Sequence, residues 1–323
     1  MQWREKIFKH HSGKEFEDLS FEVFRYQMEH CEVYASYVSM LKRNNPATLK
    51  EIPFLPISFF KSHKVVSNLT DHSTQIIFKS SGTGGMRSTH FVSDIELYKD
   101  SFSTTFSQFF GAPSDFIFLA LLPNYIEQGD SSLVFMVSEL MNASKSPYSE
   151  FILNDALKIK AAIKAAKDQG KTIVLFGVAY SLLDLIDQKV DLSECTVVET
   201  GGMKGRRKEV SKSELYLLLK EKLGIQKLYS EYGMTELLSQ AYCLADLTFQ
   251  TPPWMQVLYR DPSDPFTLSN GNKSSGLNIV DLANVHSCSF IATDDLGIKV
   301  RNGFQILGRM DSSDIRGCNL LIE

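Results

Sequence analysis

Residues 79–88 read KSSGTGGMRS and directly follow the apolar run Ile76-Ile77-Phe78, which indicates a buried strand. Glycines let a backbone turn its N–H groups toward an anion, and Ser and Thr hydroxyls add donors at the same place. The segment therefore has the composition of a phosphate-binding loop, although a flexible Gly/Ser turn between two strands fits it equally well. It is neither a Walker A loop (G-x-x-x-x-G-K-S/T) nor a G-x-G-x-x-G dinucleotide fingerprint.

A second polar set, YGMTE at residues 232–236, follows the strand-like run Lys227-Leu228-Tyr229. At the carboxyl edge of a parallel sheet, an aromatic side chain stacks on a base and a glycine admits a ligand close to the backbone. The hydroxyl binds a phosphate and the carboxylate holds Mg²⁺. The two segments together favour a nucleotide site.

Composition excludes several classes of protein. The chain has 323 residues, 43% of them apolar, which is enough for one large or two ordinary globular domains. Its net charge is −4 and its Lys and Arg residues are scattered, so we expect neither nucleic-acid binding nor a polybasic membrane patch. The N-terminus lacks the apolar core of a signal peptide and no run of eighteen apolar residues occurs, so we expect a cytoplasmic protein without a membrane span.

The cysteines argue against a metal or disulfide framework. Five occur, widely spaced and with no C-x-x-C pair. We expect most of them to be reduced, buried thiols. They are Cys31, Cys195, Cys243, Cys288 and Cys318.

The first 170 residues predict helices around one buried strand. Residues 15–42 have the spacing of one or two amphipathic helices, whereas the proline-punctuated segment 52–61 is too broken for a helix. We expect 52–61 to cross the sheet edge toward the phosphate loop. Further helices should begin at Ser93-Asp94-Ile95-Glu96 and at Ser131, and residues 116–122 should form a doubly buried strand.

Residues 155–229 predict parallel β-α-β units. Helix 155–169, stopped by Gly170, leads to strands 173–176, 196–198 and 226–229 with helices 179–188 and 211–223 between them. Three loops should then meet at one edge of the sheet, where ligands bind in open α/β folds. We place the nucleotide across them and residues 80–85. The loops are 177–179, 199–204 and 232–236.

From Trp254 onward the pattern becomes β. Short strands separated by Asp, Pro, Ser, Gly and Asn turns indicate a small antiparallel sheet or barrel appended to the α/β body. We therefore expect an α/β fold with a body at residues 1–250 and a β-rich subdomain at 251–323. The expected strands are 254–259, 276–280, 288–292 and 298–300.

The loop and the YGMTE motif together resemble those of the adenylate-forming enzymes, such as acyl-CoA synthetases, firefly luciferases and peptide-synthetase adenylation domains. TDDLG at 293–297 resembles the Thr-Gly-Asp-x-Gly motif of that superfamily, and GRMD at 308–311 resembles its Gly-Arg-x-Asp hinge. The resemblance implies the superfamily's large-domain fold, with parallel sheets flanked by helices.

A narrower resemblance covers essentially the whole chain. Five segments are similar to the acyl-protein synthetase family of the bacterial bioluminescence fatty-acid reductase. That family activates a fatty acid with ATP and takes the acyl group onto its own cysteine near the C-terminus. The segments are LPISFFK at 55–61, LLPNY at 121–125, SSL at 131–133, TGGMKG at 200–205 and RGCNL at 316–320.

The resemblance implies a role for each matching residue, with ATP and Mg²⁺ as cofactors. Those implied to hold the phosphates are Ser80, Ser81, Gly82, Thr83, Gly84, Gly85 and Arg87. Those implied around the nucleoside are Gly201, Gly202 and Tyr232 at adenine, and Asp295 at the ribose with Arg309 beside it. Gly233 is also implied to bind the cofactor. Thr235 would contact the α-phosphate, Glu236 the magnesium ion, and Cys318 would accept the acyl group.

Two departures from the superfamily pattern matter. The loop has Gly84 and Arg87-Ser88 where a second Thr and Pro-Lys are usual, so Arg87 is a candidate for the positive charge. The sequence also leads us to expect that the separate C-terminal domain, which carries a catalytic lysine, is absent. Lys204 and Lys61 are candidates for that role, although a solvated or phosphate-steering lysine is the commoner case. For His90 we favour a structural role over phosphate contact.

The expected reaction has two steps. ATP and a carboxylic acid give an acyl-adenylate, and the acyl group then passes to the Cys318 thiol and onward to an acyl-reductase or acyl-carrier partner. An acyl- or aryl-CoA ligase using CoA is an alternative, and an accessory subunit that binds the adenylate with little turnover is another. The identity of the acid, the final acceptor and the oligomeric state are left open.

Overall fold

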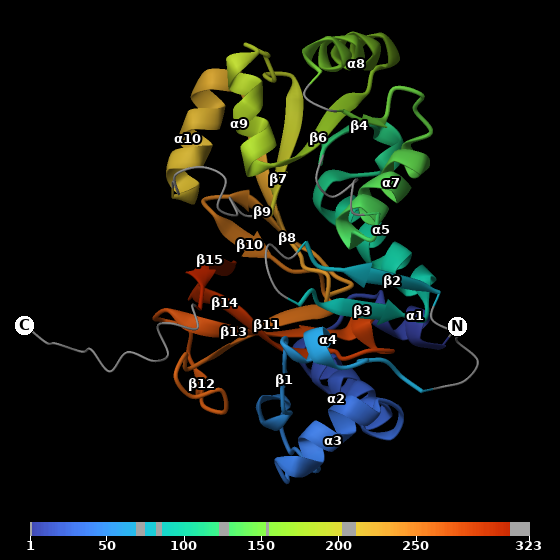
Figure 1. The fold of residues 1–323 in the computed structure, drawn as a ribbon, viewed down its shortest axis with the longest axis vertical. Coiled ribbons are helices and arrows are strands. Elements are labelled where there is room, and N and C mark those ends of the chain that lie inside the picture. Colours follow the sequence, from blue (N-terminus) through green and yellow to red (C-terminus); the bar gives the residue numbers. More distant parts are fainter. Residues whose placement is uncertain are drawn as a thin grey trace, which may run out of the picture.

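The computed structural model describes residues 2–68, 75–81, 86–122, 129–152, 155–201 and 211–310. A sheet with helices on both of its faces occupies one end of the molecule (Figure 1). The other end holds antiparallel strands with the N-terminal helices beside them. The segment that follows β8 lies where the two ends meet, because Tyr232 contacts Asp295 across that junction.

One large sheet runs through both ends, with thirteen strands among the described residues. Its parallel part consists of β5 (Glu150–Phe151), β4 (Phe116–Leu121), β6 (Thr172–Val178), β7 (Cys195–Thr200) and β8 (Lys227–Tyr232). Its antiparallel part consists of β9 (Ala241–Ala245), β10 (Thr248–Gln250), β15 (Gly303–Arg309), β14 (Phe290–Val300), β13 (Ser275–Asp281), β11 (Met255–Arg260) and β12 (Leu268–Ser269). β1 (Leu55–Pro56) pairs in parallel with β14.

The α/β fold with an added antiparallel region is thus confirmed. Hydrogen bonding continues from the parallel part through β9 and β10 into β15. The boundary placed at residues 250 and 251 remains a prediction.

Helices cover both faces of the parallel strands. Local signals explain their bounds, because Asp94, Ser131, Asp155 and Ser211 each accept backbone N–H bonds as N-caps. Ser211 and Glu214 form the expected capping box. The helices around the parallel strands are α5 (Ile95–Phe110), α7 (Ser132–Ser144), α8 (Ala156–Gln169), α9 (Ala179–Asp187) and α10 (Lys212–Leu223).

The N-terminal helices complete the fold beside the antiparallel strands. They are α1 (Gln2–Ile7), α2 (Gly13–His30), α3 (Glu32–Met40) and α4 (Phe59–Ser62). Short 3₁₀ turns are η1 (Leu49–Glu51), η2 (Pro113–Asp115) and η3 (Leu282–Asn284). No helix of the described residues is long and apolar enough to cross a membrane.

Two cores lie on opposite faces of the parallel strands. On β4, Ile117, Leu119 and Leu121 belong to the core beneath α8, α9 and α10. Phe116, Phe118 and Ala120 alternate with them and face the larger core, which also contains the residues of α5 and α7. Side chains that alternate across a strand and are apolar on both faces explain why residues 116–122 read as one unbroken apolar run.

Three details of the sequence analysis were wrong. β2 (Ile76–Lys79) is not a buried strand, because among the described residues it pairs only with β3 (Thr89–Val92), as a separate antiparallel pair, and Ile77 is 41% exposed. Segment 52–61 does contain a helical turn, α4, directly after β1. The strands expected at 288–292 and 298–300 are one strand, β14.

Candidate nucleotide and acyl-group site

A cleft of about 1210 Å³ lies at the junction of the two ends of the molecule. Residues that are far apart in the sequence line it, and most sequence-predicted site residues in the described ranges are among them. They include Lys61 of α4, Lys79, Ser80, Ser81 and Ser88 around the glycine-rich segment, Ser131 to Leu133 and Met136 at α7, Thr200 and Gly201 after β7, Glu231 to Glu236, Asp294 and Asp295 on β14, and Ile306 to Arg309 on β15.

The two ends of the glycine-rich segment are tied together. Ser80 N donates to the Ser88 carbonyl at 3.0 Å, and Ser88 N donates to Ser80 Oγ at 2.9 Å. Arg87 donates to the Ser80 carbonyl and forms an ion pair with Asp130 at 2.6 Å. These bonds hold residues 80 and 88 side by side at the cleft. Arg87 itself is not among the cleft-lining residues, because its guanidinium is turned to Asp130.

Several predicted site residues lie outside the described ranges: Gly82, Thr83, Gly84, Gly85, Gly202, Lys204 and Cys318. Their assigned roles stay predictions.

Tyr232, Asp295 and Arg309 form one contact group. The Tyr232 hydroxyl donates to Asp295 Oδ2 at 2.7 Å, and Arg309 Nε lies 3.4 Å from Asp295 Oδ1. The register of β14 against β15 causes this, since Asp295 is paired with Arg309 across the two strands. Burial raises the pKa of the Asp295 carboxyl, and the Tyr232 and Arg309 contacts oppose that rise.

Glu236 presents a carboxyl group in the cleft although only 5% of the residue is exposed. Burial raises its pKa, and a hydrogen bond from Ser88 opposes the rise. The group fits one position in a Mg²⁺ coordination sphere, because Mg²⁺ prefers carboxylate oxygens and keeps several waters and phosphate oxygens. No cluster of three or more acidic, His or Cys residues occurs in the described ranges, so the chain offers Mg²⁺ few ligands of its own there.

Buried side chains behind residues 235–239 bind their backbone. His90 Nδ1 donates to the Thr235 carbonyl at 2.7 Å, and Asn284 Nδ2 donates to the Glu236 carbonyl at 2.8 Å. Asp281 accepts the N–H groups of Leu238 and Ser239 at 2.8 and 3.0 Å. His90 therefore has a structural contact, as the sequence analysis favoured. Asn284 and Asp281 were missed there.

Sequence analysis also missed an acidic cluster in the cleft wall. Ser230 Oγ donates to Glu199 at 2.7 Å, and Lys212 Nζ lies 3.1 Å from the same carboxylate oxygen. Thr200 Oγ1 donates to Glu231. Burial, with repulsion from Glu199, raises the pKa of Glu231 to about 7. The cluster thus holds two carboxyl groups with one lysine, and the Glu231 carboxyl is about half protonated at pH 7.

Apolar side chains also line the cleft, among them Ile57, Leu133 and Met136. Tyr98 lines it too and donates its hydroxyl to the Ser132 carbonyl at 3.0 Å. A cleft lined by both apolar and polar groups suits a ligand with one apolar and one anionic end.

Cys31, Cys195 and Cys288 are free and buried, and Cys243 is buried as well. Burial raises the pKa of Cys31 and Cys288, and that of Cys195 to about 12. A thiol that stays protonated is a poor nucleophile, so burial disfavours these three cysteines as nucleophiles. The sequence analysis expected buried thiols.

Comparison with solved structures shows the fold of adenylate-forming enzymes. A 2-hydroxyisobutyryl-CoA ligase, solved with 2-HIB-AMP and CoA, superposes with a TM-score of 0.59 at 11% identity, over 90% of this chain and 66% of that one. An ATP-bound RpMatB-BxBclM chimera gives 0.54 at 18% identity, and MatB from Rhodopseudomonas palustris gives 0.52 at 17%, each over 72% of this chain. The matched region spans about half the length of these two MatB structures, 47% of each.

Sequence comparison identifies the family. No curated protein matches the chain. The family model for LuxE, acyl-protein synthetase, matches residues 7–323, which is nearly the whole chain. The protein belongs to the LuxE acyl-protein synthetase family.

Proposed function

We propose that this protein activates a carboxylic acid with ATP, giving an acyl-adenylate, and then transfers the acyl group to a protein thiol. One observation carries the first step: the cleft brings Ser80 and Ser88, Thr235 and Glu236, and the Tyr232–Asp295–Arg309 group to one place. Adenylation needs hydrogen-bond donors to the phosphates, a magnesium ligand and a nucleoside-binding group. The family is one of acyl-protein synthetases.

In the first step the acid's carboxylate oxygen attacks the α-phosphorus of ATP, and pyrophosphate leaves with the bonding electron pair. The protein has to position the two anions and stabilise the charge that they bring together. Ser80 and Thr235 would donate hydrogen bonds to phosphate oxygens, and Lys61 and Lys79 at the cleft would contribute positive charge. Glu236 would hold Mg²⁺, which supplies charge neutralisation when it is bound. Asp295 would take the ribose hydroxyls.

In the second step a thiolate attacks the acyl carbonyl and AMP leaves. The thiol proton goes to solvent or to a base. We assign the nucleophile to Cys318, which rests on the RGCNL motif and not on geometry. The described cysteines support the assignment by elimination, because all four are buried. We also propose a cytoplasmic location, as the sequence analysis expects. An acyl-reductase or acyl-carrier protein would receive the acyl group next.

The substrate we propose is a fatty acid, because the apolar side chains of Ile57, Leu133 and Met136 line the same cleft as the proposed phosphate-binding groups. The test is acid-dependent ATP–pyrophosphate exchange over fatty, aryl and hydroxy acids. Each active acid is then followed by the intact-protein mass of wild type, Cys318→Ala and the control Cys195→Ala.

The proposal predicts exchange in all three proteins and an acyl mass on wild type and Cys195→Ala only. An acyl mass on Cys318→Ala would refute the cysteine assignment. CoA-dependent turnover that survives Cys318→Ala would favour a CoA ligase, a reading that the CoA-bound ligase structure keeps open. Tight nucleotide binding without exchange for any acid would favour an accessory binding subunit.

A further inference from the structure

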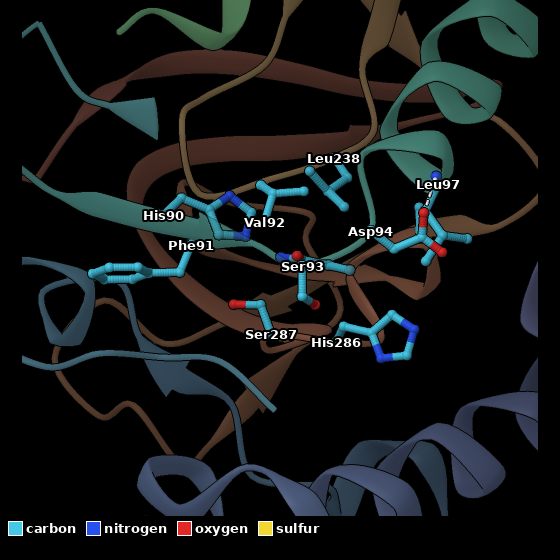
Figure 2. A pocket seen from close by; sticks show the side chains of 11 residues that line it. His90, Phe91, Val92, Ser93, Asp94, Leu97, Leu238, His286 and Ser287 are labelled. Carbon is cyan, nitrogen blue, oxygen red and sulfur yellow. Dashed lines mark hydrogen bonds between the residues drawn. The ribbon is translucent and has the colours of Figure 1, made fainter. Parts of the chain in front are cut away.

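A small cavity of about 10 Å³ lies behind the Thr235–Glu236 segment and shares no lining residue with the cleft. Figure 2 shows the side chains of His90, Ser93 and Ser287 gathered around it. Asn284 also lines it. The volume is about that needed to hold one water molecule.

The contact of His90 with Thr235 determines which ring nitrogen carries the proton. A carbonyl oxygen only accepts hydrogen bonds, so Nδ1, at 2.7 Å from the Thr235 carbonyl, is the donor. Burial lowers the pKa of His90 to about 4, so the ring is neutral near pH 7 and its Nε2 is an acceptor. Nε2 is fully buried and has no hydrogen-bond partner in the described ranges.

Asn284 presents a second acceptor at the same cavity. Its Nδ2 donates to the Glu236 carbonyl at 2.8 Å and to the Cys288 carbonyl at 2.9 Å, so its amide protons are used. Its Oδ1 is buried and, within the described part of the chain, has no donor. A hydrogen bond to the Asn284 side chain favours the charged form of His90 and opposes the lowering of its pKa by burial, so the two side chains lie close together. The neutral ring has no proton on Nε2 for that bond.

Two buried acceptors that line one cavity cannot satisfy each other, because neither has a hydrogen to donate. Leaving both without a donor destabilises the fold, because each group loses its hydrogen bond to water and gains none in return. A water molecule has two hydrogens and suits such a pair. Ser93 Oγ, which is also buried without a partner in the described ranges, adds a third polar group at the cavity.

We propose that one bound water molecule donates to His90 Nε2 and Asn284 Oδ1, and that His90 and Asn284 are positioning residues for the Thr235–Glu236 backbone. Bonds to two successive carbonyls fix the orientation of the peptide between them. This peptide carries Thr235 and Glu236, which line the cleft. The inference rests on the proposed function for the roles of these two residues at the phosphate and at Mg²⁺. Neither His90 nor Asn284 lines the cleft.

The protonation of His90 is tested without any substrate. A long-range ¹H–¹⁵N correlation spectrum of protein labelled at its seven histidines gives the tautomer of each ring. The signals of His90 are those that disappear in His90→Asn. We expect a neutral ring protonated at Nδ1 near neutral pH. An Nε2–H tautomer or an imidazolium would overturn the proposal.

The positioning role is tested by ATP–pyrophosphate exchange. His90→Phe keeps a ring but removes the donor, and we expect kcat to fall about 10–100-fold with KM for ATP within about threefold. His90→Asn retains an N–H close to the place of Nδ1–H and should recover most of the loss. The matched control is His286→Asn, which should leave kcat unchanged. His286 lines the same cavity, but its ring forms a hydrogen bond with Tyr26 of α2 and not with the Thr235–Glu236 backbone. Full kcat in a folded His90→Phe protein, or equal losses in both His90 variants, would refute the role.

The water is tested by a high-resolution crystal structure, which should show a solvent peak within hydrogen-bonding distance of His90 Nε2 and Asn284 Oδ1. A direct contact between the two side chains with no peak would overturn that part.

If wild type shows no exchange with any acid, the proposed function fails. The tautomer and the water are still decided, because neither measurement uses substrate. If His90→Phe does not fold, the His90→Asn kinetics and the spectrum remain decisive.

Discussion

The phenol of Tyr232 donates a 2.7 Å hydrogen bond to Asp295 Oδ2, joining the end of β8 to the middle of β14, 63 residues further along the chain. Both residues line the cleft. In the proposed function Tyr232 flanks adenine and Asp295 binds the ribose. The bond would therefore keep two parts of the nucleoside site in a fixed relation before ATP arrives.

Tyr232→Phe tests this relation. The variant leaves one oxygen of Asp295 without its donor, which costs about 1–3 kcal/mol, and Arg309 keeps the other oxygen. We expect weaker binding of ATP by isothermal titration calorimetry and a lower unfolding midpoint. Tyr229→Phe on the same strand is the control, because the Tyr229 ring packs against Phe110 and does not line the cleft. Unchanged affinity in Tyr232→Phe would show that the bond does not organise the site.

Glu236→Gln should separate activity from stability. Burial raises the pKa of the Glu236 carboxyl, so the fold carries a cost for its charge that a neutral amide avoids. We expect the unfolding midpoint to stay constant or rise, while ATP–pyrophosphate exchange falls and its Mg²⁺ dependence moves to higher concentration. Glu29→Gln, on an exposed helix position, controls for the lost charge. Wild-type exchange in Glu236→Gln at every Mg²⁺ concentration would remove Glu236 from the magnesium site.

Gly233→Ala should damage the wall of the cleft. A Cβ at residue 233 would stand 2.2 Å from Glu231 Oε1 and 3.4 Å from Gln240 Cγ, so the Glu231 carboxyl would have to move. That carboxyl is buried and accepts from Thr200, which leaves it little room. We expect a loss of about 1–3 kcal/mol in the free energy of unfolding, measured with urea. In Gly13→Ala the new Cβ meets nothing within 4 Å, and the stability should hardly change.

Local signals in the sequence predicted the helices well. Asp155 and Gly170 lie at the two ends of α8, and Ser211 with Glu214 begins α10, because capping depends on residues a few positions apart. The burial of β2 was not predictable in this way. Its apolar residues suggested a core strand, but burial depends on what packs against a strand, and β3 is its only pairing partner in the described ranges.

Long-range pairing explains what was missed at the site. Thr200 and Glu231 lie next to each other because β7 pairs in parallel with β8 in that register, and no motif marks residues 31 positions apart. The His90–Thr235 bond spans 145 residues. By contrast, YGMTE is contiguous, and its position at the end of β8 follows from the alternating β-α-β pattern.

The acidic cluster makes a prediction about pH and stability. Burial raises the pKa of Glu231 from 4.5 to about 7, so between these values the folded protein keeps a proton that the unfolded chain releases. Stability from this group is therefore fully present below about pH 4.5 and is lost as pH rises toward 7, by on the order of 3 kcal/mol.

Glu231→Gln removes the titration. Asp295 and Glu236, whose pKa values are also raised, act in the same direction and remain in both proteins. The measurement is thus the difference between the urea unfolding free energies of wild type and Glu231→Gln across pH 4.5 to 7.5. The variant should gain on wild type as pH rises, and a constant difference would show that Glu231 is ionised throughout, with Lys212 and Thr200 outweighing its burial.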